Sequence, residues 1–148
     1  MKQKGTYRIN ISAPNLMNIC IDASKDGEWS GRLYHCYNDG AILFSNVLEL
    51  LKEFEIMFDR IGFPQASTKT RHFLKKEDVK QEKPKKVKDQ KDLMQYEGQM
   101  GTFIVYVRYR QNSTWQGEMY WKEKDFKYSF FNVLEFVKQI DDAIAKIN

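Results

Sequence analysis

Cysteine, histidine and proline are scarce in this chain of 148 residues, which contains two, two and three of them respectively. Two cysteines without a CxxC pair are too few for a disulfide scaffold, and we expect reduced thiols. No apolar run reaches the roughly 18 residues that a membrane-spanning helix needs, and the N-terminus lacks the apolar segment of a signal peptide. We therefore expect a cytoplasmic protein that does not enter the membrane.

Sequence patterns of catalysis are also missing. The chain has no phosphate-binding loop, nucleophile elbow, HExxH motif or dinucleotide fingerprint. His35 and His72 are the only histidines, and no group of ligand residues has the spacing of a metal site. We therefore expect a protein that is not an enzyme and that uses no metal or cofactor.

The net charge of +4 is concentrated in the middle of the chain. Residues 64–100 hold ten basic and six acidic residues, whereas residues 1–63 and 101–148 are each within one charge of neutrality. The run KKEDVKQEKPKKVKDQKD, residues 75–92, has almost no apolar side chains and cannot form a core. This composition predicts a charged, flexible linker between two nearly neutral parts.

An internal repeat organises the two neutral parts. A shift of 86 residues aligns residues 29–52 with residues 115–138 without a gap, and ten of these 24 positions are identical. Both windows begin with a tryptophan and a nearby glycine, and both contain Asn-Val-Leu-Glu before apolar residues at helical spacing. Each half is predicted to end in an amphipathic helix of about four turns. The asparagine would cap its first N–H groups and the glutamate would reach back.

Alternating side chains upstream of each helix predict β-strands. In the second half, residues 103–110 and 115–122 form two strands joined by a polar turn. In the first half, residues 17–23 align with the earlier of these strands, but residues 6–12 also resemble the start of the second half. Both assignments are open at this point, and we favour residues 6–12 as an extra N-terminal strand before the repeat.

The expected fold class is α+β, with two ββα repeats that pair about a pseudo-two-fold axis into one antiparallel sheet, both helices on one face. Residues 1–66 form the first repeat with its extra N-terminal strand, residues 67–100 the linker, and residues 101–148 the second repeat. The long linker allows a monomer or a swapped homodimer. The predicted core residues are Ile19, Ile21, Leu33, Val47, Leu51, Phe54, Phe58, Val105, Val107, Met119, Val133, Val137, Ile140 and Ile144.

Basic and aromatic residues of the second half provide the candidate binding site. Tyr106, Arg108 and Arg110 alternate away from the apolar positions of their strand, and Tyr120 and Gln116 belong to the next strand. Such residues occur as ordinary sheet cover, at protein interfaces and on single-stranded nucleic-acid modules. The sequence predicts a non-enzymatic binding or adaptor protein of unknown protein partner. The alternative is single-stranded nucleic-acid binding.

Four short motifs suggest a family. The sequences SGRLYH (residues 30–35), FPQA (residues 63–66), RQNSTWQG (residues 110–117) and YW (residues 120–121) resemble those of short, uncharacterised proteins of Gram-positive gut anaerobes. This resemblance covers nearly the whole chain and implies a cytoplasmic protein. It implies no activity and no catalytic residue.

The motif RQNSTWQG also divides by position. Its tryptophan and glycine recur in the first half, and the residues between Arg110 and Trp115 form the turn. Arg110 and Gln116 are therefore the site candidates within the motif. We expect the fold to tolerate the replacement of both.

Overall fold

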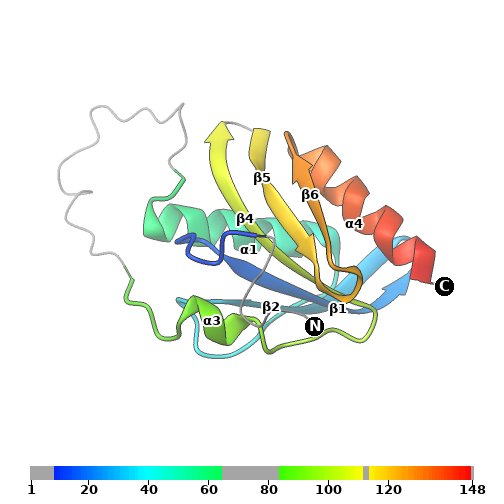
Figure 1. Cartoon of the computed structure of the whole chain (residues 1–148), viewed down its shortest axis with the longest axis horizontal. Coiled ribbons are helices and arrows are strands. Elements are labelled where there is room, and N and C mark those ends of the chain that lie inside the picture. The colour runs from blue at the N-terminus through cyan, green and yellow to red at the C-terminus, as the bar shows by residue number, and fades with distance from the viewer. Residues whose placement is uncertain (1–8, 65–83, 112–113, 148) are drawn as a thin grey trace.

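A computed structural model describes residues 9–64, 84–111 and 114–147 (Figure 1). The fold class is α+β, and the described residues form one open antiparallel sheet of six strands in the order β3-β2-β1-β4-β5-β6. Strands β1 and β4 pair at the centre of the sheet, where Ile19 lies opposite Phe103. In chain order the elements are β1 (Met17–Lys25), β2 (Glu28–His35), β3 (Ile42–Phe44), α1 (Val47–Ile61), α3 (Gln90–Leu93), β4 (Gly101–Gln111), β5 (Thr114–Trp121), a 3₁₀ turn (Lys122–Lys124), β6 (Phe126–Phe130) and α4 (Val133–Ile147).

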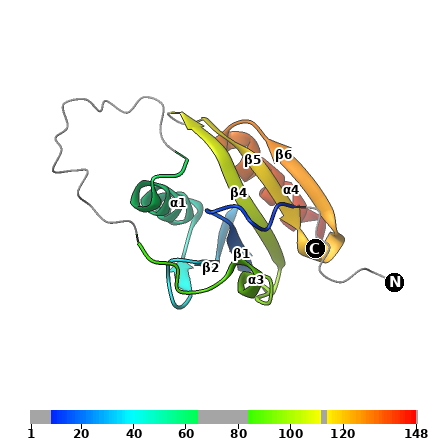
Figure 2. The same ribbon diagram turned by 60° about the vertical axis from the view of Figure 1, so that its left-hand side comes forward.

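Helices α1 and α4 cover one face of the sheet and close the main core (Figures 1 and 2). All fourteen predicted core residues are buried in this core or packed against it, which confirms that prediction. Leu50 and Met57 of α1 and Phe136 of α4 are also buried. The ring centroid of Phe136 lies 5.7 Å from the ring centroid of Phe54. The central contact between the two helices is therefore aromatic.

Both long helices begin as the Asn-Val-Leu-Glu sequence predicts. The Asn46 side chain accepts a hydrogen bond from the Glu49 N–H at 2.9 Å, and Asn132 accepts one from the Glu135 N–H at 2.8 Å. The Glu49 carboxylate accepts the N–H of Ser45 at 2.7 Å, one residue before the cap. Caps of this kind contribute about 1 kcal/mol each, so this sequence has a structural role.

Two short edge strands were not predicted from the pattern. Strands β3 and β6 extend the sheet beyond the two hairpins, pairing with β2 and β5 respectively. They contain three and five residues, which is too short for a reliable alternating pattern. Each long helix therefore follows three strands, whereas the sequence predicted two.

The extra strand expected over residues 6–12 is absent from its described part, residues 9–12, which passes through a bend and a turn. The Asn10 side chain accepts the N–H of Ser12 at 2.9 Å, and such side-chain hydrogen bonds favour turns over strands. Residues 17–23, the favoured first strand of the repeat, do form a strand: they lie within β1, which pairs with β2 and β4.

The second face of the sheet is covered by residues 9–16 and by residues 84–100, which lie in front of the strands in Figure 1. Asn18 donates hydrogen bonds to the carbonyls of Leu93 at 2.7 Å and Tyr96 at 3.0 Å. The Tyr96 ring stacks on Tyr34 with 3.7 Å between centroids. Residues 84–100 lie within the range expected to be a linker, but these contacts attach them to the sheet. Residues 65–83 lie outside the described residues.

Each hairpin contains a β-bulge opposite a glycine. Ile21 of β1 pairs with Gly31, and Val107 of β4 pairs with Gly117. In β1 and in β4, the next paired residue lies two positions further along the strand, so one residue is left unpaired. One extra residue on the bulged strand reverses the alternation of all later side chains. Arg110 therefore points to the helix face, although uninterrupted alternation predicts the opposite face.

Candidate protein-interaction surface

Arg110 is buried and ion-paired to α1. Its Nη1 and Nη2 atoms donate to Glu55 at 2.6 Å and Asp59 at 3.0 Å, and its Nε donates to the Pro64 carbonyl at 3.2 Å. Its guanidinium lies 5.3 Å from the Phe58 ring centroid, and its side chain is 6% exposed. The expectation that Arg110 is an exposed binding residue is wrong because the bulge turns it inward.

The tryptophans of the repeat also attach the helices to the sheet. The Trp115 indole donates to Glu55 at 2.9 Å, and the Trp29 indole donates to Asp141 of α4 at 3.2 Å. Glu55 thus accepts hydrogen bonds from both Arg110 and Trp115. The motif RQNSTWQG fixes the position of α1 through these two contacts.

The remaining candidate residues do not form an exposed aromatic surface. Tyr106 and Tyr120 are 7% and 8% exposed, and their hydroxyls donate to Glu118 at 3.0 Å and Asp125 at 2.8 Å. Burial, followed by the hydrogen bond to Glu118, raises the pKa of Tyr106. Arg108 is half exposed at the bulge, 3.8 Å from Glu118.

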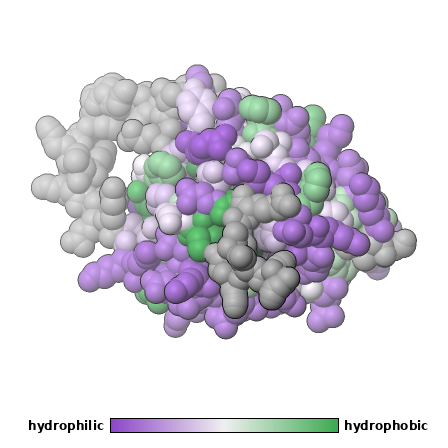
Figure 3. Space-filling model, in the orientation of Figure 1, coloured by the Kyte–Doolittle hydropathy of each residue, from purple (hydrophilic) through white to green (hydrophobic). Residues whose placement is uncertain are grey.

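Gln116 is half-buried on β5, beside the residues just described. On this side of the molecule, hydrophilic side chains predominate around small hydrophobic areas (Figure 3). Because Tyr106 and Tyr120 are buried, their rings are not exposed for stacking against bases, a contact common in proteins that bind single-stranded nucleic acid.

The outer side of α1, opposite its core side, carries exposed apolar residues. Leu48 and Ile56 are 63% and 50% exposed, although the other half of the helix already contacts the core. They recur with Lys52 and Asp59 at intervals of three to four residues, so all four lie in one row on the helix. We call these four residues the outer stripe of α1. A groove of about 590 Å³ runs along it, lined by Leu48, Leu51, Lys52, Glu55, Ile56 and Asp59.

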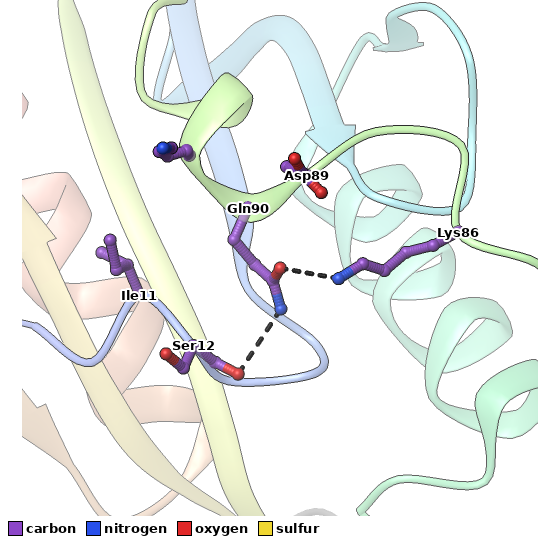
Figure 4. Close-up of a pocket in the computed structure, with 6 residues that line it drawn as sticks. Ile11, Ser12, Lys86, Asp89 and Gln90 are labelled. Carbon is purple, nitrogen blue, oxygen red and sulfur yellow. Dashed lines mark hydrogen bonds between the residues drawn. The ribbon is translucent and has the colours of Figure 1, made fainter.

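A second concave area lies between the N-terminal segment and α3 (Figure 4). Its volume is about 390 Å³. The Gln90 side chain crosses it, donating to the carbonyls of Ser12 at 3.4 Å and Ala13 at 3.1 Å and accepting from Lys86 at 2.9 Å. These polar groups already bind each other, so this area joins two segments of the chain.

The groups most suited to catalysis are in unreactive surroundings. Burial lowers the pKa of His35 to about 4 and raises the pKa of the Cys20 thiol to about 12, so both are neutral near pH 7. Burial also raises the pKa of Cys36. In the described part of the chain, no group of three His, Cys, Asp or Glu residues could hold a metal ion. His72 lies outside the described residues.

Acid is expected to destabilise the protein through His35. Its Nδ1 accepts the N–H of Tyr37 at 3.1 Å, and Arg60 and Lys88 lower its pKa further after burial. The unfolded chain binds this proton near the ordinary pKa of 6.5 and the folded chain only near 4. The contribution of neutral His35 to the free energy of unfolding is therefore fully present above about pH 6.5. It is lost as the pH falls towards 4, and this shift corresponds to about 3 kcal/mol.

Urea denaturation of the wild type and of His35→Gln across this pH range tests this expectation. The variant should lose less stability than the wild type as the pH falls. Parallel curves for the two proteins would show that His35 does not cause the acid sensitivity.

Sequence reasoning did not identify the outer stripe of α1. The available signal was the presence of Leu48 and Ile56 outside the core row of an already amphipathic helix.

Among the described residues, none of the helices has both the length and the apolar character of a membrane span. Comparison with known proteins found no matching family model, no matching curated protein and no matching solved structure.

Proposed function

We propose that this protein is a non-enzymatic binding protein that holds another polypeptide on the outer stripe of α1. The exposure of Leu48 and Ile56 along one groove is the observation that carries the proposal. Apolar side chains gathered in a groove and bordered by charges are typical of protein-interaction sites. The groove suits the apolar side of a helix that carries an acidic group for Lys52 and a basic group for Asp59.

The rigidity of the groove also supports this function. Glu55 and Asp59 line the groove and are held from behind by Arg110, while Trp115 holds Glu55 as well. A surface that is already ordered loses little conformational entropy when it binds. Arg110 thus serves the site by positioning α1, and its own side chain stays covered.

We also infer that the two halves are related βββα repeats about a pseudo-two-fold axis between β1 and β4. Several features support this relation at a shift of 86 residues: the bulges opposite Gly31 and Gly117, the tryptophan contacts to the opposite helix, and the helix caps. The repeat places Asp142 of α4 where α1 has Ile56. The apolar centre of the stripe is therefore specific to α1.

Replacing Leu48 and Ile56 together by aspartate is expected to release the partner and leave the fold intact. Both side chains are at least half exposed, and surface changes usually alter stability by about 0.5 kcal/mol or less. The measurement is the native size of the protein in fresh lysate, by size-exclusion chromatography with detection of this chain. The wild type should elute above the 17.6 kDa of one chain, and the double variant should elute as a monomer.

The matched control replaces Phe131 and Leu134, which are 58% and 68% exposed at the start of α4, by aspartate. This control should keep the size of the wild type. Elution of the wild type as a monomer, or an equal shift in the control, would reject the proposed function.

A further inference from the structure

We infer that the occupant of the α1 groove is a second copy of this chain, whose α1 packs antiparallel across a two-fold axis between Glu55 and Ile56. This inference rests on the proposed function and names its partner. The order of charges along the stripe and the difference between α1 and α4 both favour a second copy.

The outer stripe is self-complementary when it is read in opposite directions. Around an axis between Glu55 and Ile56, Lys52 faces the partner's Asp59, and the symmetry repeats this pair on the other side. Ile56 meets the partner's Ile56 at the centre, and Leu48 reaches the partner's Phe63. Phe63 of the described chain is 37% exposed. A two-fold interface uses the same patch on both chains, and Lys52 and Asp59 match each other across this axis. Glu55 also lies beside the axis, but both of its carboxylate oxygens already accept hydrogen bonds from Arg110 and Trp115.

The charges of the stripe are accessible for such pairing. Asp59 is 71% exposed, and Arg110 engages only one of its two carboxylate oxygens, Oδ1. Lys52 is exposed and makes no ion pair with the described residues. Each would gain one opposite charge from the second copy.

Helix α4 cannot form the same contact. At a shift of 86 residues, the counterparts of Lys52, Ile56 and Asp59 are Lys138, Asp142 and Ala145. An antiparallel α4 pair would bring two copies of Asp142 together at the axis and would leave each Lys138 beside an alanine. Like charges at a contact oppose association. The geometry therefore favours a dimer through α1 and provides α4 as an internal control.

Charge reversal tests the dimer with purified full-length protein and no other component. The wild type is expected to have twice the mass of one chain, 17.6 kDa, which is about 35 kDa by sedimentation or light scattering. Lys52→Asp and Asp59→Lys should each weaken the dimer by about tenfold or more, because each places like charges together twice. An equimolar mixture of the two variants should recover the dimer, because each mixed dimer has one native Lys52–Asp59 pair and one pair in which the Lys52→Asp and Asp59→Lys side chains carry opposite charges. Lys138→Asp on α4 should leave the mass unchanged.

Ile56→Asp provides a second route that does not involve Arg110. It should also produce a monomer, because two carboxylates would meet at the axis, and this monomer should still unfold in one cooperative transition, which shows that the fold is kept. A wild-type mass of one chain at about 50 µM would overturn the inference, because a dimer with a Kd well below that concentration would be largely assembled. Failure of the mixed variants to recover a dimer would also overturn it. If the purified protein is a monomer while its lysate complex still depends on Leu48 and Ile56, the second copy is excluded and the proposed function stands.

Discussion

Replacing Gly31 or Gly117 by alanine is expected to lower the free energy of unfolding by about 3 kcal/mol or more, among the largest effects of any single methyl group in this chain. A Cβ at Gly31 would lie 1.9 Å from the Cys20 carbonyl oxygen, and one at Gly117 would lie 2.1 Å from the Tyr106 carbonyl oxygen. Both obstacles are backbone atoms of the bulged partner strand, which cannot rotate away as a side chain can. Each hairpin would have to change its register to admit the methyl group.

Urea denaturation measures this loss, and Gly40→Ala is its matched control. A Cβ at Gly40 meets no atom within 4 Å, and its backbone is not left-handed, so this variant should match the wild type. Equal stabilities for Gly31→Ala and Gly40→Ala would mean that the close approach at the bulge does not exist. The register of β1 against β2 would then need revision.

Replacing Arg110 by methionine is expected to lower the free energy of unfolding by about 3 kcal/mol. The guanidinium is 6% exposed and bonds to Glu55, Asp59 and the Pro64 carbonyl, so its removal leaves three acceptors without their donor. Removing one partner of a buried charge pair costs about 3 to 5 kcal/mol, and the lower value applies because both carboxylates remain partly exposed. The sequence predicted that the fold would tolerate this change, and the contacts of Arg110 indicate the opposite.

Arg108→Met is the matched control for Arg110→Met. Arg108 lies on the same strand, but its side chain is 50% exposed and its nearest carboxylate is 3.8 Å away. Surface pairs of this kind contribute about 0 to 1 kcal/mol, so its denaturation curve should remain near that of the wild type. If both arginine variants lost the same stability, burial of Arg110 would not be the cause.

The repeat in the sequence was sufficient to predict the two hairpins, the two long helices and their asparagine caps. These features depend on local patterns that occur twice, and each copy supports the other. The bulges could not be predicted because a single extra residue leaves no signature until the strands are paired. The faces of Arg108 and Arg110 were therefore assigned from an alternation that stops at Val107.

The cover of the second sheet face was missed for a different reason. Residues 84–100 are rich in charge, yet Leu93 and Met94 are buried and Tyr96 stacks on Tyr34. A few apolar anchors suffice because the neighbouring carbonyls receive hydrogen bonds from the sheet, as at Asn18. Composition averages over a segment and does not detect such anchors.

The outer stripe of α1 was missed because the core row of the helix already accounted for its apolar content. Sequence periodicity finds the side of a helix that faces the core, and Leu48 and Ile56 lie outside it. Their importance emerges only when their exposure is known. The comparison of α1 with α4 in the repeat could have indicated it, because Ile56 stands where α4 has Asp142.

Docking of another protein chain on the outer stripe of α1 can be observed by site-specific photo-crosslinking in living cells. A photoreactive amino acid is placed at position 56 in one variant and at position 142 of α4 in the other. We expect a crosslinked protein adduct from position 56 that disappears when Leu48→Asp is added, and no such adduct from position 142. Absence of an adduct at position 56, or one that persists with Leu48→Asp, would contradict this docking.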